Sequence, residues 1–280
     1  MTIPTNSQVV DADARLATVF SHFYCVQQAS DAPPLRQQLL PNYEMMLAFN
    51  FGPEIPVSIG DSDYMVRKTA VLGPLQKAIT YELPAGADLI VVNFTLNGFH
   101  RLLKVPMQQF SAGDIYNPDV LLNKNCFEDL WHQLAGMPEL SDRLQLLSEY
   151  ALTFVAPIAS SAHPLMDSIP YFKESATDPI KALADTYQLS PRSIQLRFQA
   201  QLGYSAKELI RFLRFKKVLG FLFQAYPAPV DWLDLVLKFG YHDHSHLIKD
   251  FHYFLDMTPR QFLAQLAQGN VCVSKPGKFY

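Results

Sequence analysis

Residues 178–264 carry one short helical pattern twice, and this duplication limits the possible folds more than any other feature of the chain. The first copy spans 178–198, and the second spans 230–254 with Phe239-Gly240-Tyr241 at its turn. Each copy predicts a short helix with apolar periodicity, a tight turn, and a second helix with one apolar and one polar face. That is the helix-turn-helix layout, whose second helix enters the major groove of DNA. Two copies in one chain predict a protein that reads two neighbouring stretches of one duplex.

Capping side chains mark the helix starts of this region. Three of them stand before a proline at the first helical position, where the missing N–H costs nothing: Asp178-Pro179, Ser190-Pro191 and Thr258-Pro259. The residues from Ser205 to Glu208 form a predicted capping box that opens a long helix through about Phe223. A helix of about 18 residues is roughly 27 Å long. Such a connector could hold two reading helices about one DNA turn apart.

The polar face of each second helix supplies the candidate DNA-binding residues. They are Arg192, Ser193, Gln195, Leu196 and Gln199 on the first helix and His244, Ser245, Ile248 and Lys249 on the second. An arginine can grip guanine, a glutamine can pair with adenine, and an outward leucine or isoleucine can touch a thymine methyl group. Lys249 suits either a base contact or a phosphate contact. One polar helix face alone is usually a solvated surface. Two such faces, each on the helix that follows a helix-turn-helix turn, favour a DNA-binding function.

The net charge of −3 conceals a division of charge along the chain. Residues 180–280 hold 13 Lys and Arg against 7 Asp and Glu, a balance of +6, whereas residues 1–179 hold 10 against 19. A basic third joined to an acidic remainder indicates a nucleic-acid module carried by another domain. At 280 residues the chain is long enough for two domains with separate cores.

The residues before the helical repeats predict a β-rich domain, so the expected fold class is α+β. An arm and one amphipathic helix around Arg15–Tyr24 come first, and short apolar or alternating runs follow. These runs predict a small antiparallel β-barrel of cupin-like type, with strands near 44–51, 65–72, 77–83 and 88–95. Asn97-Gly98 is typical of a hairpin turn, although residues 99–104 could equally start a helix.

A pair of amphipathic helices follows the predicted barrel. The first has an apolar face that includes Phe127 and Trp131, and the second has an apolar stripe that ends at Phe154 and Val155. The two stripes can pack on the barrel or on the same helices of a second subunit. Their aromatic content favours a homodimer, because aromatic residues are enriched in interface cores. A dimer would bring four reading helices to the DNA.

The chain divides into four expected segments, and Ser, Ala and Pro residues mark the boundary between the two domains. These segments are a β-rich sensor and dimerisation domain with the helical pair (1–160), a linker (161–177), the all-α double helix-turn-helix domain (178–268) and a tail (269–280).

The carboxy-terminal residues resemble the AraC/XylS family of bacterial transcription regulators over about ninety positions. The first unit and the helix after it match at Leu183-Ala184, Leu189-Ser190-Pro191, Phe198, 202–205, Arg211, Arg214 and Leu219. The second unit matches at 239–241, Ser245-His246, Phe251 and 257–262. The resemblance implies two helix-turn-helix units that read successive major-groove faces of duplex DNA. It also implies RNA polymerase as a partner, a role as an activator, and an amino-terminal domain that senses a small-molecule effector or dimerises.

Three departures from the family pattern bear on DNA reading. Leu196 stands where such proteins commonly carry Arg, which changes the bases read or removes a phosphate contact. Leu235-Val236 replaces the usual Ile-Ala, and its larger side chains are expected to alter helix packing. Residues 242–244 place two histidines around the start of the second reading helix, so we expect its reading to vary with pH.

Enzymatic and metal chemistry are not expected. His242 and His246 lie four apart on a predicted helix, but no further Cys or His is spaced to complete a metal shell. The same DNA-binding unit also occurs fused to DNA-alkylation repair domains, whose cysteine-rich zinc cluster cannot be built from Cys25 and Cys126 alone. The sequence has no P-loop, dinucleotide fingerprint or nucleophile elbow. No cofactor is therefore expected.

The sequence predicts a cytoplasmic protein without a membrane anchor. The longest uncharged apolar run, 89–96, is far too short to span a bilayer. Residues 1–7 lack the basic and apolar regions of a signal peptide. The three cysteines, which have no ligand spacing, are expected to be reduced thiols: Cys25, Cys126 and Cys272.

The effector, the operator and the sign of regulation, activation or repression, are left open by the sequence. Aromatic residues such as Tyr43 and Phe94 could line a barrel cavity, although aromatic residues in strands more often form core. The alternative to a regulator is a protein-interaction module that has lost DNA binding. The acidic overall charge and Leu196 favour that alternative.

Overall fold

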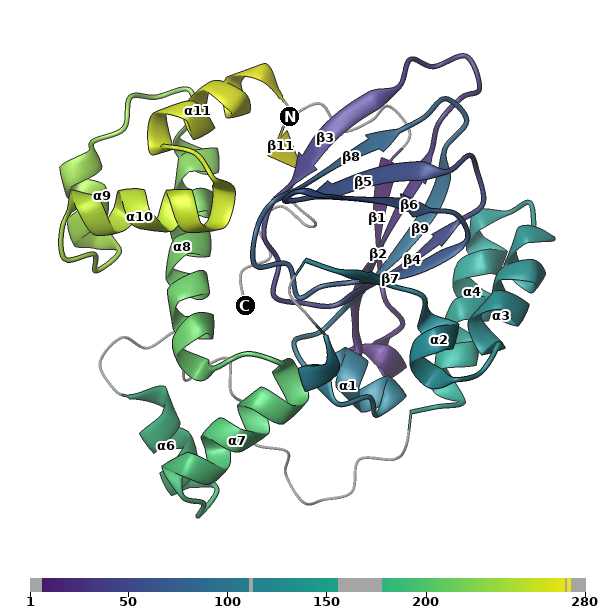
Figure 1. Cartoon of the computed structure of the whole chain (residues 1–280), viewed down its shortest axis with the longest axis horizontal. Coiled ribbons are helices and arrows are strands. Elements are labelled where there is room, and N and C mark those ends of the chain that lie inside the picture. The colour runs from purple at the N-terminus through teal and green to yellow at the C-terminus, as the bar shows by residue number, and fades with distance from the viewer. Residues whose placement is uncertain (1–6, 111–112, 156–177, 270, 273–280) are drawn as a thin grey trace.

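The computed structural model describes residues 7–110, 113–155, 178–269 and 271–272. A β-sandwich forms the amino-terminal domain, and a group of helices beside it forms the carboxy-terminal domain (Figure 1). The predicted linker, 161–177, lies outside the described residues, as does most of the predicted tail. Among the described helices, none combines the length and the apolarity that crossing a bilayer requires.

The amino-terminal strands, together with β11 from the carboxy-terminal end of the described chain, form two sheets. The six-stranded sheet has the order β1 (Ser7–Asp11), β2 (Phe20–Gln27), β9 (Asp88–Phe94), β4 (Met46–Asn50), β7 (Thr69–Leu72) and β10 (Ile115–Tyr116). The five-stranded sheet has the order β11 (Val271–Cys272), β3 (Leu35–Leu39), β8 (Ile79–Leu83), β5 (Ile55–Ile59) and β6 (Ser62–Val66). Neighbouring strands are antiparallel except β11 and β3, which are parallel. The expected α+β fold class is confirmed, with two sheets in place of a closed barrel.

Side-chain alternation along β2 divides the domain into layers. Tyr24 and Val26 point into the space between the two sheets, whereas Phe23 and Cys25 point to the opposite face of the six-stranded sheet. Helices cover that opposite face, and they are α1 (Gly98–Leu103), α3 (Cys126–Ala135) and α4 (Leu140–Leu152), with the short α2 (Pro118–Leu122) beside them. The predicted helix around Arg15–Tyr24 is wrong, because a short 3₁₀ helix at Ala14–Leu16 leads directly into β2.

The helical pair α3 and α4 packs on this chain's own sheet. Phe127 is buried against it, and the indole Nε1 of Trp131 donates a hydrogen bond to the Asn50 carbonyl oxygen at 2.7 Å. Arg143 on α4 donates to the Asp88 carboxylate at 2.7 Å and is buried there. Two of the aromatic side chains that favoured a dimer are thus covered within the monomer. The homodimer therefore stays a prediction, and the packing of Phe127 and Trp131 no longer argues for it.

The carboxy-terminal domain consists of two short units joined by one long helix. The first unit is α6 (Pro179–Thr186) and α7 (Pro191–Leu202), the connector is α8 (Ala206–Ala225), and the second unit is α9 (Trp232–Lys238), α10 (His244–Leu255) and α11 (Pro259–Gln268). The two units lie at opposite ends of α8 (Figure 1). Their apolar side chains, together with those of α8, form a single core cluster.

Candidate nucleic-acid interface

The first helix-turn-helix unit is shaped by the capping residues that its sequence carries. Asp178 accepts a hydrogen bond from the backbone N–H of Ile180, and Ser190 accepts one from that of Ser193. Helix α7 ends at Gly203, which has a left-handed φ of 79°. Along α7 the buried residues are Ile194, Phe198 and Leu202, a spacing of four that keeps one apolar face against the core.

The opposite face of α7 is open to solvent. Arg192, Gln195 and Leu196 are exposed there, and 58% of the Leu196 surface is accessible. The other two predicted residues also have partners within the chain. The Ser193 hydroxyl lies 2.8 Å from that of Ser190, and the Gln199 amide donates to the Gly203 carbonyl oxygen at 3.3 Å. Each side chain keeps further hydrogen-bonding capacity for DNA, because a hydroxyl has two acceptor lone pairs and an amide has a second N–H and an acceptor oxygen.

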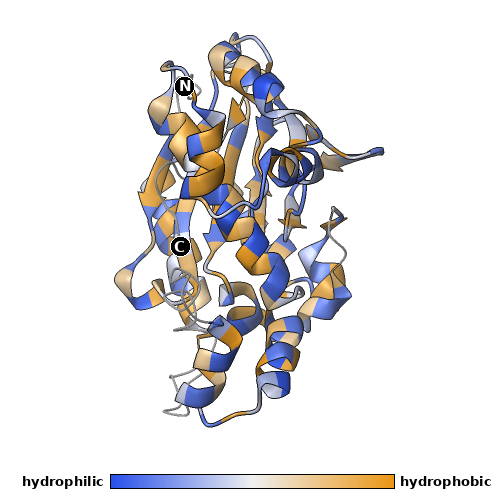
Figure 2. Cartoon of the chain, turned by 90° about the vertical axis from the view of Figure 1, so that its left-hand side faces the viewer, coloured by the Kyte–Doolittle hydropathy of each residue, from blue (hydrophilic) through white to orange (hydrophobic). Residues whose placement is uncertain are grey.

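The second unit repeats this arrangement. Asp243 caps α10 by accepting from the backbone N–H of His246, and Gly240 provides the left-handed turn with a φ of 67°. The four predicted residues of this helix are all exposed, and they are His244, Ser245, Ile248 and Lys249. Figure 2 shows the resulting hydrophilic and hydrophobic stripes on the helices. The structure therefore gives both units a solvent-facing second helix.

A buried carboxylate ties α10 to the connector helix. The Asp250 side chain accepts from Arg211 Nε at 2.7 Å and from the Tyr241 hydroxyl at 2.9 Å. Arg214 lies over the Tyr241 ring at 4.4 Å. Burial, together with the neighbouring carboxylate, raises the pKa of Tyr241, so this hydroxyl remains a donor. Asp250 is not among the residues predicted from the sequence, although its partner Arg211 and the neighbouring Arg214 belong to the family pattern.

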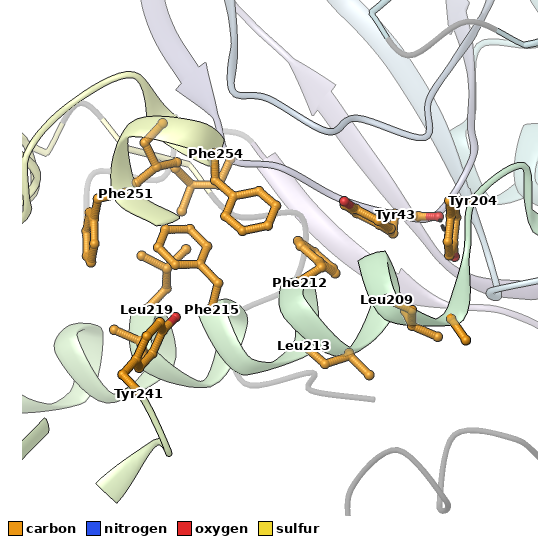
Figure 3. Packing of buried hydrophobic residues seen from close by; sticks show 14 of the residues in the cluster. Tyr43, Tyr204, Leu209, Phe212, Leu213, Phe215, Leu219, Tyr241, Phe251 and Phe254 are labelled. Atoms are coloured by element: carbon orange, nitrogen blue, oxygen red, sulfur yellow. Dashed lines mark hydrogen bonds between the residues drawn. The ribbon is translucent and has the colours of Figure 1, made fainter. Parts of the chain in front are cut away.

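Aromatic rings fill the space between α8 and α10. Phe215 stacks on Phe254 with ring centroids 4.7 Å apart, and it meets Phe251 edge to face at 5.0 Å (Figure 3). All three side chains are fully buried. Together with the Asp250 contacts, this packing fixes the second unit on the connector.

The connector and the residues just before it also pack against the β-sandwich. The Tyr204 ring meets Tyr43 edge to face, and the Tyr204 hydroxyl donates to the Tyr43 carbonyl oxygen at 3.3 Å (Figure 3). Burial raises the pKa of both tyrosines, which keeps them neutral. The second unit touches the sandwich through the Ala78 N–H, which donates to the Phe254 carbonyl oxygen at 3.0 Å. We call this set of contacts the interdomain seam. It leaves the exposed faces of α7 and α10 uncovered.

The histidines at the start of α10 lie close together without forming a metal centre. The rings of His242 and His246 are 5.7 Å apart, and His246 Nδ1 lies 3.0 Å from the Asp243 carboxylate. The N–H groups at the start of α10, followed by the His246 ring, lower the pKa of Asp243. Within the described ranges, no three His, Cys, Asp or Glu side chains gather closely enough to hold a metal ion.

Two family models match separate parts of the sequence. Residues 183–265 match a helix-turn-helix domain of the AraC type, and residues 8–115 match a domain of unknown function. A search of curated proteins gives no match.

Solved structures align with the chain at low identity. ToxT from Vibrio cholerae shares 8% identity, with 86% of this chain and 96% of ToxT covered and a TM-score of 0.43. ToxT from Vibrio cholerae O395, bound to (E)-4-(8-methylnaphthalen-1-yl)but-3-enoic acid, shares 11%, with 94% and 100% covered and a TM-score of 0.43. The AraC-like transcriptional activator CuxR shares 11%, with 74% and 73% covered and a TM-score of 0.26. The family match, and not these alignments, decides the assignment. The carboxy-terminal domain is therefore an AraC-type helix-turn-helix domain, that of a DNA-binding transcription regulator.

Proposed function

We propose that this protein controls transcription by reading two successive major-groove segments of one duplex, with α7 in one and α10 in the other. The observation that carries the proposal is the pair of second helices, each with one exposed face, at opposite ends of one connector helix. The 20 residues of α8 span roughly 30 Å at 1.5 Å per residue. That length is close to the 34–36 Å that separates successive major-groove faces.

The exposed side chains divide by the contacts their chemistry allows. Arg192 and Gln195 can each form paired hydrogen bonds with a base edge, and they are the proposed sequence readers. Leu196 and Ile248 offer apolar contact to thymine methyl groups. Lys249 can bind a base or a phosphate. If it binds a base, its removal changes the preferred DNA sequence, and if it binds a phosphate, its removal weakens binding to all sequences alike.

Control by the amino-terminal domain is also part of the proposal. The seam supports it, because Tyr43 and Ala78 of the sandwich contact α8 and α10 directly. A small molecule that altered these strands would act on the placement of the second unit. Recruitment of RNA polymerase as an activator, and action as a homodimer, remain proposals that rest on the family resemblance.

The test is selection of duplexes from a random pool by the full-length protein, followed by fluorescence anisotropy on the enriched sequence. We expect one sequence class to be enriched, and log affinity to fall linearly with log salt as phosphate contacts release counterions. Arg192→Ala should weaken binding to the enriched sequence. Arg36→Ala is the matched control, because it removes the same charge from an exposed position on β3. If no sequence is enriched, or if both variants bind alike, the proposal fails in favour of an interaction module.

A further inference from the structure

Histidine is concentrated in the second helix-turn-helix unit. Residues 242–252 hold four of the eight histidines of the chain, whereas residues 178–203, which form the first unit, hold none. The imidazole is the side chain whose charge ordinarily changes between about pH 5 and pH 8. Of the two units, only the second therefore carries side chains of this kind. All four are exposed, and they are His242, His244, His246 and His252.

The four histidines divide into two pairs by their contacts. The rings of His242 and His246 lie 5.7 Å apart, and His246 Nδ1 lies 3.0 Å from the Asp243 carboxylate that caps α10. The side chains of His244 and His252 make no hydrogen bond, ion pair or ring contact with any residue in the described part of the chain. This second pair is therefore available to a partner outside the chain.

His244 and His252 lie on one face of α10. They are eight residues apart with Ile248 midway, and eight residues advance a helix by about 12 Å and turn it by only about 80° beyond two full turns. The exposed Lys249 lies beside them. This is the face proposed to enter the major groove. A helix in that groove runs between two phosphate backbones, so a cation on this face has phosphate oxygens nearby.

The charged side chains that reach α10 from the connector lie on its buried side. Arg211 and Arg214 of α8 are 2.7 and 3.8 Å from the Asp250 carboxylate. At the end of α9, Lys238 lies over an aromatic ring of α8 at 4.2 Å, and the sandwich contacts α10 through a backbone hydrogen bond. The other charged residues on α10, in the turns at its ends and at the start of α11 are exposed, and they are Asp243, Lys249, Asp256 and Arg260.

We infer that His244 and His252, when protonated, bind DNA phosphates, so that the second unit holds DNA more tightly as the pH falls while the first unit does not change. This inference rests on the proposed placement of α10 in the major groove. The direction follows from charge, because a neutral imidazole offers no cation to a phosphate and an imidazolium does. Each such contact releases counterions and adds about 0.9 to the slope of log affinity against log salt.

The test is fluorescence anisotropy of the full-length protein with the enriched duplex, over a salt series at about pH 6 and about pH 8. We expect tighter binding at the lower pH, with a salt slope steeper by up to about 1.8, which is two contacts at about 0.9 each. His244→Gln and His252→Gln should each halve this difference, and the double variant should remove it. His252→Lys carries a permanent charge, so it should keep the slope of its own contact at both pH values. Circular dichroism checks the fold of each variant.

Two other histidines serve as controls. His132→Gln removes an exposed histidine from α3 in the amino-terminal domain and should leave the pH dependence as it is. His246→Gln removes the ring that lies against Asp243, and it should also keep the pH dependence, because that ring acts at the cap of α10. Equal salt slopes at the two pH values would overturn the inference. So would a pH dependence that His246→Gln removes and the double variant keeps.

The same measurements separate this inference from the proposed function. Binding of the enriched duplex at about pH 8, where an ordinary imidazole is neutral, tests the function without the histidine contacts. If that binding is sequence-specific and the salt slopes are equal, the inference alone fails. If no sequence is preferred at either pH, the proposed function fails and the inference fails with it.

Discussion

The ring of Tyr43 stacks on the ring of Phe212, with their centroids 4.1 Å apart and an angle of 15° between their planes. Tyr43 belongs to the β-sandwich and Phe212 to α8, so the stack joins the amino-terminal domain to the connector of the carboxy-terminal domain. Both side chains are buried, although they come from different domains. The two domains therefore share part of one core.

We expect Tyr43 and Phe212 to be energetically coupled. A double-mutant cycle with Tyr43→Ala and Phe212→Ala should give a coupling free energy of about 0.5–1.5 kcal/mol in urea unfolding. The control pairs Tyr43→Ala with Phe262→Ala, because the ring contacts of Phe262 are with Phe223 and Phe251 and not with Tyr43. Those two effects should add. A coupling near zero for the first pair would mean that the stack does not hold the domains together in solution.

Removal of the Asp250 carboxylate should destabilise the DNA-binding domain. Asp250→Ala leaves Arg211 and the Tyr241 hydroxyl without their acceptor, and we expect a loss of about 3 kcal/mol in the free energy of unfolding. Tyr241→Phe removes one hydrogen bond and should cost about 1 kcal/mol. The control is Asp234→Ala on α9, an exposed carboxylate, which should change stability by at most about 0.5 kcal/mol. Equal effects at positions 250 and 234 would contradict the network.

The base preference should depend on Arg192 and Gln195 individually. Each Ala variant should relax preference at one position of the enriched sequence, at about 1–3 kcal/mol for each lost bidentate pair. Lys181→Ala, an exposed position on α6, serves as the control and should leave the order of preferred sequences unchanged. The measurement is selection followed by sequencing for each variant. If both reader variants keep the original preference, a different face of α7 meets the DNA.

The thiol of Cys25 should resist alkylation in the folded protein. Burial, with a smaller effect of Asp88, raises its pKa to about 12, whereas the ordinary thiol value is 9.0. Because the folded-state pKa is the higher one, this group contributes stability below about pH 9 and loses it as the pH rises toward about 12. Iodoacetamide at pH 8 with mass mapping should label the partly exposed Cys126 before Cys25. Comparable labelling of both in the native state would show that β2 opens readily.

The helical domain was predictable because its signals are local. Each cap from Asp178 to Thr258 makes its expected side-chain hydrogen bond, and the predicted long helix begins after the Ser205 capping box. The exposed faces of α7 and α10 follow from the same periodicity. Whether those faces bind DNA with the assigned roles is still a prediction.

The failures of prediction concern contacts between distant residues. The stretch around Arg15–Tyr24 suggested a helix, but strand β2 begins within it. Because β2 is buried on both faces, it lacks the alternation of polar and apolar residues that marks a surface strand. Asp250 was overlooked because its partners come from another helix. The side-chain oxygen of Asn93 is buried between the two sheets and accepts no hydrogen bond within the described part of the chain. Its position depends on how the two sheets meet, which no residue spacing along the sequence reveals.

The pairing of β11 with β3 has a consequence for synthesis on the ribosome. The edge of β3 is covered only when residues 271–272 arrive, although β3 itself ends at Leu39. The last sandwich strand before β11 ends at Tyr116, so at about 5–20 residues per second the interval from there to Val271 is on the order of eight to thirty seconds. Throughout it the nascent sandwich presents an unpaired strand edge to other chains. We therefore expect a chain truncated before Val271 to aggregate more readily during expression than the intact protein.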